Sequence, residues 1–217
     1  MTLPNKFALG IVGAFVLVVA GLLVVAGLDE EDSTAPLTRG ESLLVREDSH
    51  VLGEKGASEV TFVEFLDFEC EGCRAVYPAI EQLREDYAGR VTFVARYFPM
   101  PGHFNAERAA RAVEAAAQQG KFEEMYHRMY ETQEQWGEQQ KPLDDLFRSF
   151  AADLNLDMDA YDTAYAAPST AARIKKDQDD GIALGVEGTP TFFVNGERLE
   201  PRTYGDLTAA LDEALGS

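Results

Sequence analysis

Apolar positions form one long unbroken run near the N-terminus and a series of shorter periodic segments after it. The run Phe7–Leu28 contains no charged or strongly polar side chain. About twenty consecutive apolar residues suffice to cross a bilayer as a helix. We predict an uncleaved transmembrane anchor at residues 7–28. A cleaved signal peptide usually has a shorter apolar core, and a core helix at a protein surface would show a polar face.

The charges on either side of this run predict its orientation. Lys6 precedes it, and the acidic residues 29–32 follow it directly. Because positive residues stay on the cytoplasmic side, residues 1–6 are expected in the cytoplasm and everything after Leu28 outside it. The polar residues 29–49 are interpreted as an extracytoplasmic linker. A single-pass protein of the cell membrane with an extracytoplasmic domain at 50–217 is therefore predicted.

Three segments of the outer domain have the composition of strands. Residues 60–66, 91–98 and 191–194 are rich in β-branched and aromatic side chains. The first is almost continuously apolar, which is typical of a strand covered on both faces. Asn195-Gly196 predicts a hairpin turn after the third strand.

Segments of helical period lie between and after these strands. One follows the first strand to about Tyr87, a helical block fills about 104–167, and a last helix closes the chain. The order predicts an α/β fold with a helical insertion between the second and third core strands.

A stripe of Met and aromatic residues lies in this insertion. Phe122, Met125, Tyr126, Met129 and Tyr130 recur at offsets of 0, 3, 4, 7 and 8, which predicts one buried face of a helix. Such a stripe can also line a binding groove. A peptide-binding surface that includes Tyr126, Tyr130 and Trp136 is the alternative, but core packing is the preferred interpretation.

Composition excludes several classes of protein. A net charge of −19 repels phosphate backbones, so no nucleic-acid partner is expected. The two cysteines cannot form a multi-bridge scaffold. The three histidines lack the paired spacing of a zinc site, and no EF-hand loop is present, so no metal is predicted.

The cysteines form a Cys-X-X-Cys motif where the first strand gives way to a helix. Cys70 falls near the helix N-terminus, where free N–H groups and the helix dipole stabilise a thiolate. Cys73 follows one turn later and can close a disulfide to Cys70. Glu71 and Gly72 lie between them, and Gly72 allows close backbone packing. The context favours a redox pair.

Two further residues point to the same site. Glu64 interrupts the apolar first strand, and a buried carboxylate is costly unless it has a task or a partner. It could exchange a proton with Cys73; a carboxylate satisfied by lysine or water is the alternative. Pro190 comes directly before the third strand, where proline is tolerated.

The segments VEFLDFECEGC and GTPTFFVNG, separated by a helical insertion, resemble the DsbA-like branch of the thioredoxin superfamily, most closely its membrane-anchored Gram-positive and actinobacterial forms. The resemblance implies a thioredoxin fold. It implies that Cys70 is the exposed attacking thiol, Cys73 the buried resolving thiol and Glu64 a buried acid. It also implies a cis Pro190, with the Thr189 backbone pairing with an extended substrate.

One departure from this family concerns the residues between the cysteines. Strongly oxidising members have Pro-His there, whereas this chain has Glu71-Gly72, preceded by Asp67 and Glu69. Carboxylates disfavour a nearby thiolate. We therefore expect the helix terminus to lower the Cys70 pKa, but less than to the value of about 3.5 known for DsbA, and we expect a weaker oxidant.

The resemblance favours an oxidase that introduces disulfides into unfolded secreted proteins. Its only redox group would be the Cys70–Cys73 disulfide, without another cofactor. A quinone-linked membrane protein of the DsbB or vitamin K epoxide reductase (VKOR) type would reoxidise it. The alternatives are a reductase or isomerase of the same fold, and a non-catalytic anchored binding module with a static disulfide.

Overall fold

The computed structural model describes residues 43–216. The predicted anchor at 7–28, the residues before it and the linker up to residue 42 lie outside this range. No helix in the range 43–216 has both the length and the apolar character needed to cross a bilayer.

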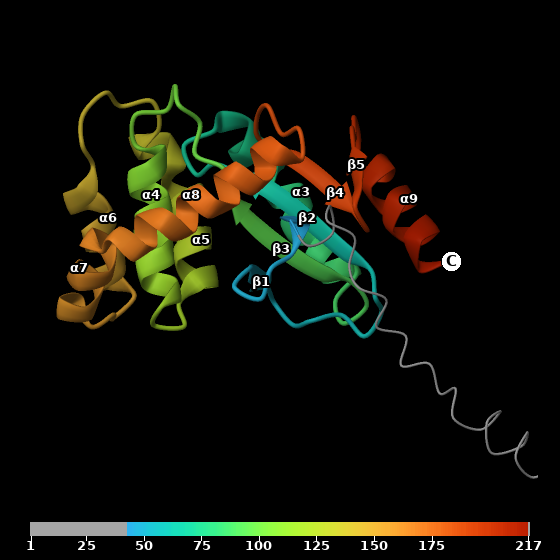
Figure 1. Ribbon diagram of the computed structural model, residues 1–217, viewed down its shortest axis with the longest axis horizontal. Helices are drawn as coiled ribbons and strands as arrows, with labels where there is room; N and C mark the ends of the chain where they lie inside the picture. The colour runs from blue at the N-terminus through green and yellow to red at the C-terminus, as the bar shows by residue number, and fades with distance from the viewer. Residues whose placement is uncertain (1–42, 217) are drawn as a thin grey trace, which may run out of the picture. The chain divides into compact units, whose positions relative to one another are not determined.

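A five-stranded mixed sheet organises the folded unit (Figure 1). Its strands lie in the order β1-β3-β2-β4-β5. The bounds are β1 His50–Leu52, β2 Thr61–Leu66, β3 Thr92–Tyr97, β4 Thr191–Val194 and β5 Glu197–Leu199. Only β2 and β3 pair in parallel; the other pairs are antiparallel. The three predicted strands are thus confirmed as the centre of the sheet, and the Asn195-Gly196 turn joins β4 to β5.

Both faces of the central strand β2 are covered, as its apolar sequence predicts. Phe62 and Leu66 belong to a core cluster that includes residues of helix α3 (Glu71–Asp86). Val63 and Phe65 belong to a second cluster on the other face. Glu64 therefore lies on the α3 side of the sheet, because side chains alternate along a strand.

Helices form the rest of the fold (Figure 1). The insertion contains α4 Ala106–Ala117, α5 Phe122–Trp136, α6 Asp144–Asp153 and α7 Met158–Ala166. Helix α8 (Pro168–Ala183) leads back to the sheet, and α9 (Tyr204–Leu215) closes the chain. Helices α4–α7 span residues 106–166, in the segment for which sequence analysis predicts a helical insertion at about 104–167.

The Met and aromatic stripe of α5 is core. Met125 and Met129 are fully buried, and Tyr126, Tyr130 and Trp136 are at most 3% exposed. The preferred interpretation of this stripe is confirmed, and these rings do not form an open peptide-binding surface.

The folded unit begins earlier than predicted. Leu44 is 3% exposed, and Arg46 donates two hydrogen bonds to the Asp180 carboxylate. The polar composition of this segment is typical of a linker. Sequence analysis did not predict that the segment folds, because its charged side chains pair with residues far along the chain. Strand β1 was also not predicted: three residues are too few for an alternating pattern.

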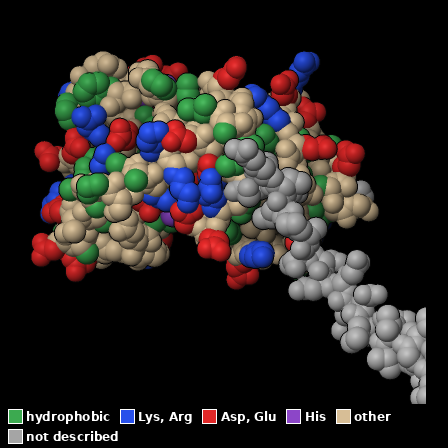
Figure 2. Space-filling view, in the orientation of Figure 1, with side chains coloured by type: hydrophobic (Ala, Val, Ile, Leu, Met, Phe, Trp, Pro, Cys, Tyr) green, Lys and Arg blue, Asp and Glu red, His purple; other side chains and the backbone are tan. Residues whose placement is uncertain are grey.

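On the face drawn in Figure 2, the acidic side chains are not gathered into one patch. Figure 2 shows Asp and Glu side chains interleaved with Lys and Arg over the visible face. This distribution is typical of a solvated protein surface.

Candidate active site

The turn between β2 and α3 places Cys70 at the N-cap of the helix. Its backbone is extended, with φ −69° and ψ 122°, and its N–H donates to the Asp67 carbonyl at 3.1 Å. The Gln133 amide on α5 supports the turn by donating to the carbonyls of Phe68 at 2.7 Å and Cys70 at 2.9 Å. Sequence analysis missed Gln133, although a polar residue on the buried face of α5 is a signal for such a role.

The two thiols have unequal environments. Cys70 is 9% exposed and Cys73 only 1% exposed, and both are free thiols. Cys70 is thus less open than the resemblance implies, but more open than Cys73. A hydrogen bond from the Cys73 thiol is the main cause that lowers the pKa of Cys70 to about 5, and contacts with Thr189 and the N–H groups of Cys73 and Gly72 add to it against the effect of burial.

The pKa of Cys73 moves the opposite way. Burial raises it well above its ordinary value, and the charges of Cys70 and Glu64 act in the same direction. The helix terminus therefore lowers the Cys70 pKa as predicted, but it is not the leading cause, which is the neighbouring thiol.

Pro190 lies against the thiol pair. The Thr189–Pro190 peptide bond is cis, as the resemblance implies, and the Cys70 Sγ donates to the Thr189 carbonyl at 3.3 Å. A Cβ at Gly72 would lie 3.4 Å from Pro190 Cδ and 3.5 Å from Cys70 Sγ. The absence of a side chain at Gly72 thus leaves room between Cys70 and the cis-proline.

The carboxyl group of Glu64 is buried below these thiols. Burial, followed by the charges of Glu81 and Cys70, raises its pKa to about 8. No group of residues 43–216 hydrogen-bonds to it. The alternative of a lysine-satisfied carboxylate is therefore not what the structure shows, and Glu64 holds a proton at neutral pH.

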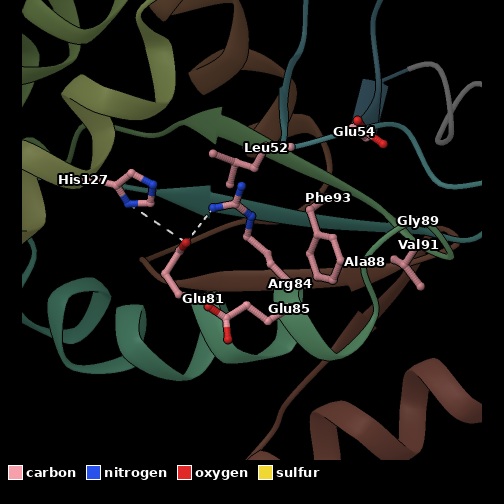
Figure 3. Close-up of a pocket in the computed structure, with 11 residues that line it drawn as sticks. Leu52, Glu54, Glu81, Arg84, Glu85, Ala88, Gly89, Val91, Phe93 and His127 are labelled. Atoms are coloured by element: carbon pink, nitrogen blue, oxygen red, sulfur yellow. Dashed lines mark hydrogen bonds and ion pairs between the residues drawn. The ribbon is translucent and has the colours of Figure 1, made fainter.

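Glu81 lies on the same side of α3 as Cys73, two turns further along the helix. It lines a cavity of about 310 Å³ together with Arg84 and His127. Figure 3 shows its carboxylate directed toward both: Arg84 Nη1 donates at 2.6 Å, and His127 Nδ1 lies at 4.0 Å. Sequence reasoning did not single out Glu81, because a glutamate on a partly exposed helix face carries no signal of its own.

The acidic residues before Cys70 bond to the loop that follows β3. Asp67 is 2% exposed and accepts from the N–H of Met100 at 2.8 Å. Glu69 is equally buried, and its Oε2 accepts from the N–H of Asn105 at 2.5 Å. Burial raises the pKa of Glu69. Asp67 and Glu69 thus accept hydrogen bonds from backbone N–H groups, and these bonds reduce the effect of their negative charge on the Cys70 thiolate. Glu71, between the cysteines, is exposed to solvent.

A cavity of about 600 Å³ next to Pro190 could hold a ligand. It is lined by residues of α3, the β4–β5 hairpin and α9. Within residues 43–216, no group of three or more His, Cys, Asp or Glu side chains is placed to hold a metal ion.

Comparison with known proteins places this geometry in a family. The family model described as thioredoxin matches residues 46–213. Among curated relatives, the Na(+)/H(+) antiporter NhaA 3 of Salinispora tropica is 41% identical over 170 residues, which are 77% of this chain and 25% of that protein. NhaA 1 of Mycolicibacterium gilvum is 35% identical over 176 residues, 78% of this chain and 27% of that protein. The chain thus spans about a quarter of the length of these relatives.

Solved structures with a similar fold include thiol–disulfide oxidoreductases. A thioredoxin-like oxidoreductase from Silicibacter pomeroyi DSS-3 is 30% identical with a TM-score of 0.68, over 83% of this chain and 99% of that chain. Wolbachia pipientis alpha-DsbA1 has a TM-score of 0.72 at 20% identity, over 82% and 96% of the two chains. BdbD from Bacillus subtilis has a TM-score of 0.68 at 21% identity, over 78% and 94%. The chain belongs to the thioredoxin family, and its structural neighbours are DsbA-like thiol–disulfide oxidoreductases.

Proposed function

We propose that the chain is a membrane-anchored oxidase that introduces disulfides into secreted proteins outside the cytoplasm. The observation that carries the proposal is the asymmetry of the thiols: the pKa of Cys70 is lowered to about 5 and that of Cys73 is raised. A disulfide is a stronger oxidant when its reduced form is stabilised, and a stable Cys70 thiolate provides this stabilisation.

The first step is attack by a substrate thiolate on the Cys70 sulfur. The Cys70–Cys73 bond breaks, a bond between Cys70 and the substrate sulfur forms, and the electron pair moves to Cys73. Because burial raises the pKa of Cys73, this sulfur takes up a proton. Glu64, with a pKa of about 8, has a proton to give at neutral pH and acts as the general acid.

The second step releases the product. Another substrate thiolate attacks the substrate sulfur of the mixed disulfide, and Cys70 leaves as a thiolate. The substrate has then lost two electrons, and the enzyme holds them as its reduced thiol pair. The Thr189 backbone and the cavity beside Pro190 favour an extended substrate segment next to Cys70.

The proposal includes a partner that reoxidises the enzyme and a location at the membrane. A quinone-linked membrane protein of the DsbB or VKOR type takes the two electrons and restores the disulfide. The apolar run at 7–28 anchors the chain with its N-terminus in the cytoplasm.

The reduction potential of the full chain in detergent tests the direction of the reaction. Equilibration with glutathione should give a value between about −120 and −190 mV for an oxidase. A value below about −230 mV would instead support a reductase or isomerase. Cys70→Ser should abolish exchange with a model disulfide, and a wild-type chain that does not exchange at all would support a static disulfide.

A further inference from the structure

An imidazole outside the Cys-X-X-Cys motif is bonded to the active-site turn. His103, in the loop between β3 and α4, has its Nδ1 2.6 Å from the Oδ2 of Asp67. The His103 side chain is 34% exposed, whereas that of Asp67 is completely buried. The backbone N–H of Met100 donates to the same Oδ2 at 2.8 Å. The backbone carbonyl of Met100 accepts from the backbone N–H of His103 at 3.0 Å. These contacts fix the imidazole against the carboxylate.

Asp67 connects this imidazole to the attacking thiol. Its Oδ1 accepts from the Glu69 N–H at 2.8 Å, and its backbone carbonyl accepts from the Cys70 N–H at 3.1 Å. A buried carboxylate so close to Cys70 would disfavour a second negative charge there. A cation bonded to that carboxylate removes this opposition.

The environment of His103 keeps it cationic at neutral pH. The hydrogen bond to Asp67 raises the pKa of His103 to about 9, and the charges of Cys70 and Glu69 add to this effect. His103 lines a surface cavity, and the other charged groups that line it are Glu107 and Arg108 of α4 and Lys175 of α8. These charges have both signs, so they do not replace the specific pairing with Asp67.

We propose that His103 is a positioning residue: as the counter-ion of Asp67, it stabilises the Cys70 thiolate from outside the motif. The residues between the two cysteines, Glu71 and Gly72, supply no cation. His103 provides a cation from the β3–α4 loop. This inference rests on the proposed function only in that the Cys70 thiolate is the leaving group of the exchange.

The test compares three histidine variants of the full chain. His103→Gln keeps a hydrogen-bond donor for Asp67 without the charge, and His103→Lys keeps the charge. His127→Gln is the control, because His127 bonds to Tyr77 and not to the turn. Thiolate absorbance at 240 nm against pH gives the Cys70 pKa. We expect His103→Gln to raise it by roughly half a unit to one unit, because loss of the cation leaves the buried Asp67 carboxylate to oppose the thiolate.

The reduction potential provides a second readout. A tenfold change in the exchange equilibrium corresponds to about 30 mV, and His103→Gln should shift the potential to a more negative value by up to this amount. His103→Lys should restore much of both the pKa and the potential. Unfolding curves verify that each variant is folded.

Two results would overturn the proposal. The first is a Cys70 pKa and potential in His103→Gln that match those of His127→Gln. The second is an equal shift in His103→Gln and His103→Lys, which would assign the effect to hydrogen-bond geometry and not to charge. A wild-type Cys70 that titrates as an ordinary thiol would count against the proposed oxidase, and the difference between variants would still measure the role of His103.

Discussion

A single buried acid and a buried cluster of charged side chains lie on opposite faces of the same pair of strands. Glu64 on β2 is aligned with Ala95 on β3, so the next residue, Arg96, points to the other face. Arg96 is fully buried and donates to Asp177 at 2.8 Å, to Asp180 at 2.7 Å and to the carbonyl of Leu43 at 2.7 Å. Glu64 has no hydrogen-bond partner among residues 43–216.

The comparison distinguishes buried charges that stabilise the fold, at Arg96, from a buried acid that takes part in chemistry, Glu64. The Arg96 cluster joins β3, α8 and the segment that enters the fold, and each of its charges faces an opposite charge. An isolated buried carboxylate stabilises nothing in its charged form and takes up a proton instead. A buried acid without a partner therefore indicates function more strongly than a buried ion pair does.

The largest expected effect is the pH dependence of stability due to Glu64. Its pKa of about 8 in the folded chain exceeds the ordinary value of 4.5, so the folded state binds this proton more tightly. The stabilisation is complete below about pH 4.5 and is lost as the pH rises through 8. The total is roughly 4 to 5 kcal/mol, from about 1.4 kcal/mol for each pKa unit.

Comparison with Glu64→Gln isolates this contribution. Urea unfolding of the disulfide form between pH 5 and 9, where neither thiol titrates, should show the variant gaining stability relative to the wild type as the pH rises. Thiol exchange should slow by roughly tenfold to a hundredfold, because the variant lacks the acid that protonates Cys73. Parallel stability curves for the two proteins would mean that Glu64 stays charged and has a partner.

The second prediction concerns a variant that removes the central cation of the Arg96 cluster. Arg96→Leu leaves the carboxylates of Asp177 and Asp180 buried without their central cation, which should lower the free energy of unfolding by about 3 to 5 kcal/mol. The Cys70 pKa of the folded variant should stay near 5, since the cluster lies on the other face of the sheet. Urea unfolding and thiolate titration measure the two quantities.

An exposed ion pair provides the matched control for this variant. Arg148 makes two 2.8 Å bonds to Asp162 at the surface, and Arg148→Leu should leave stability close to that of the wild type. If Arg96→Leu behaves like Arg148→Leu, the buried cluster does not stabilise the fold, and the contrast between the two faces disappears.

Local patterns predicted the parts of the site that are local in sequence. Cys70 and Cys73 share one helical turn, and Asn195-Gly196 determines its own hairpin. The bond between Asp67 and His103 joins residues 36 positions apart, and that between Gln133 and the Cys70 carbonyl spans 63 positions. No spacing rule predicts such contacts, because they depend on how the β3–α4 loop and α5 pack over the turn.

The residues between the cysteines should have the smallest effect. Glu71 is exposed, so solvent screens its charge, whereas Asp67 and Glu69 are buried. Glu71→His should lower the Cys70 pKa by a few tenths of a unit, roughly, and Glu71→Gln by less, since it only removes the negative charge. Thiolate absorbance at 240 nm measures both. If all three proteins titrate alike, residue 71 does not contribute to the stability of the Cys70 thiolate, and its identity does not set the strength of the oxidant.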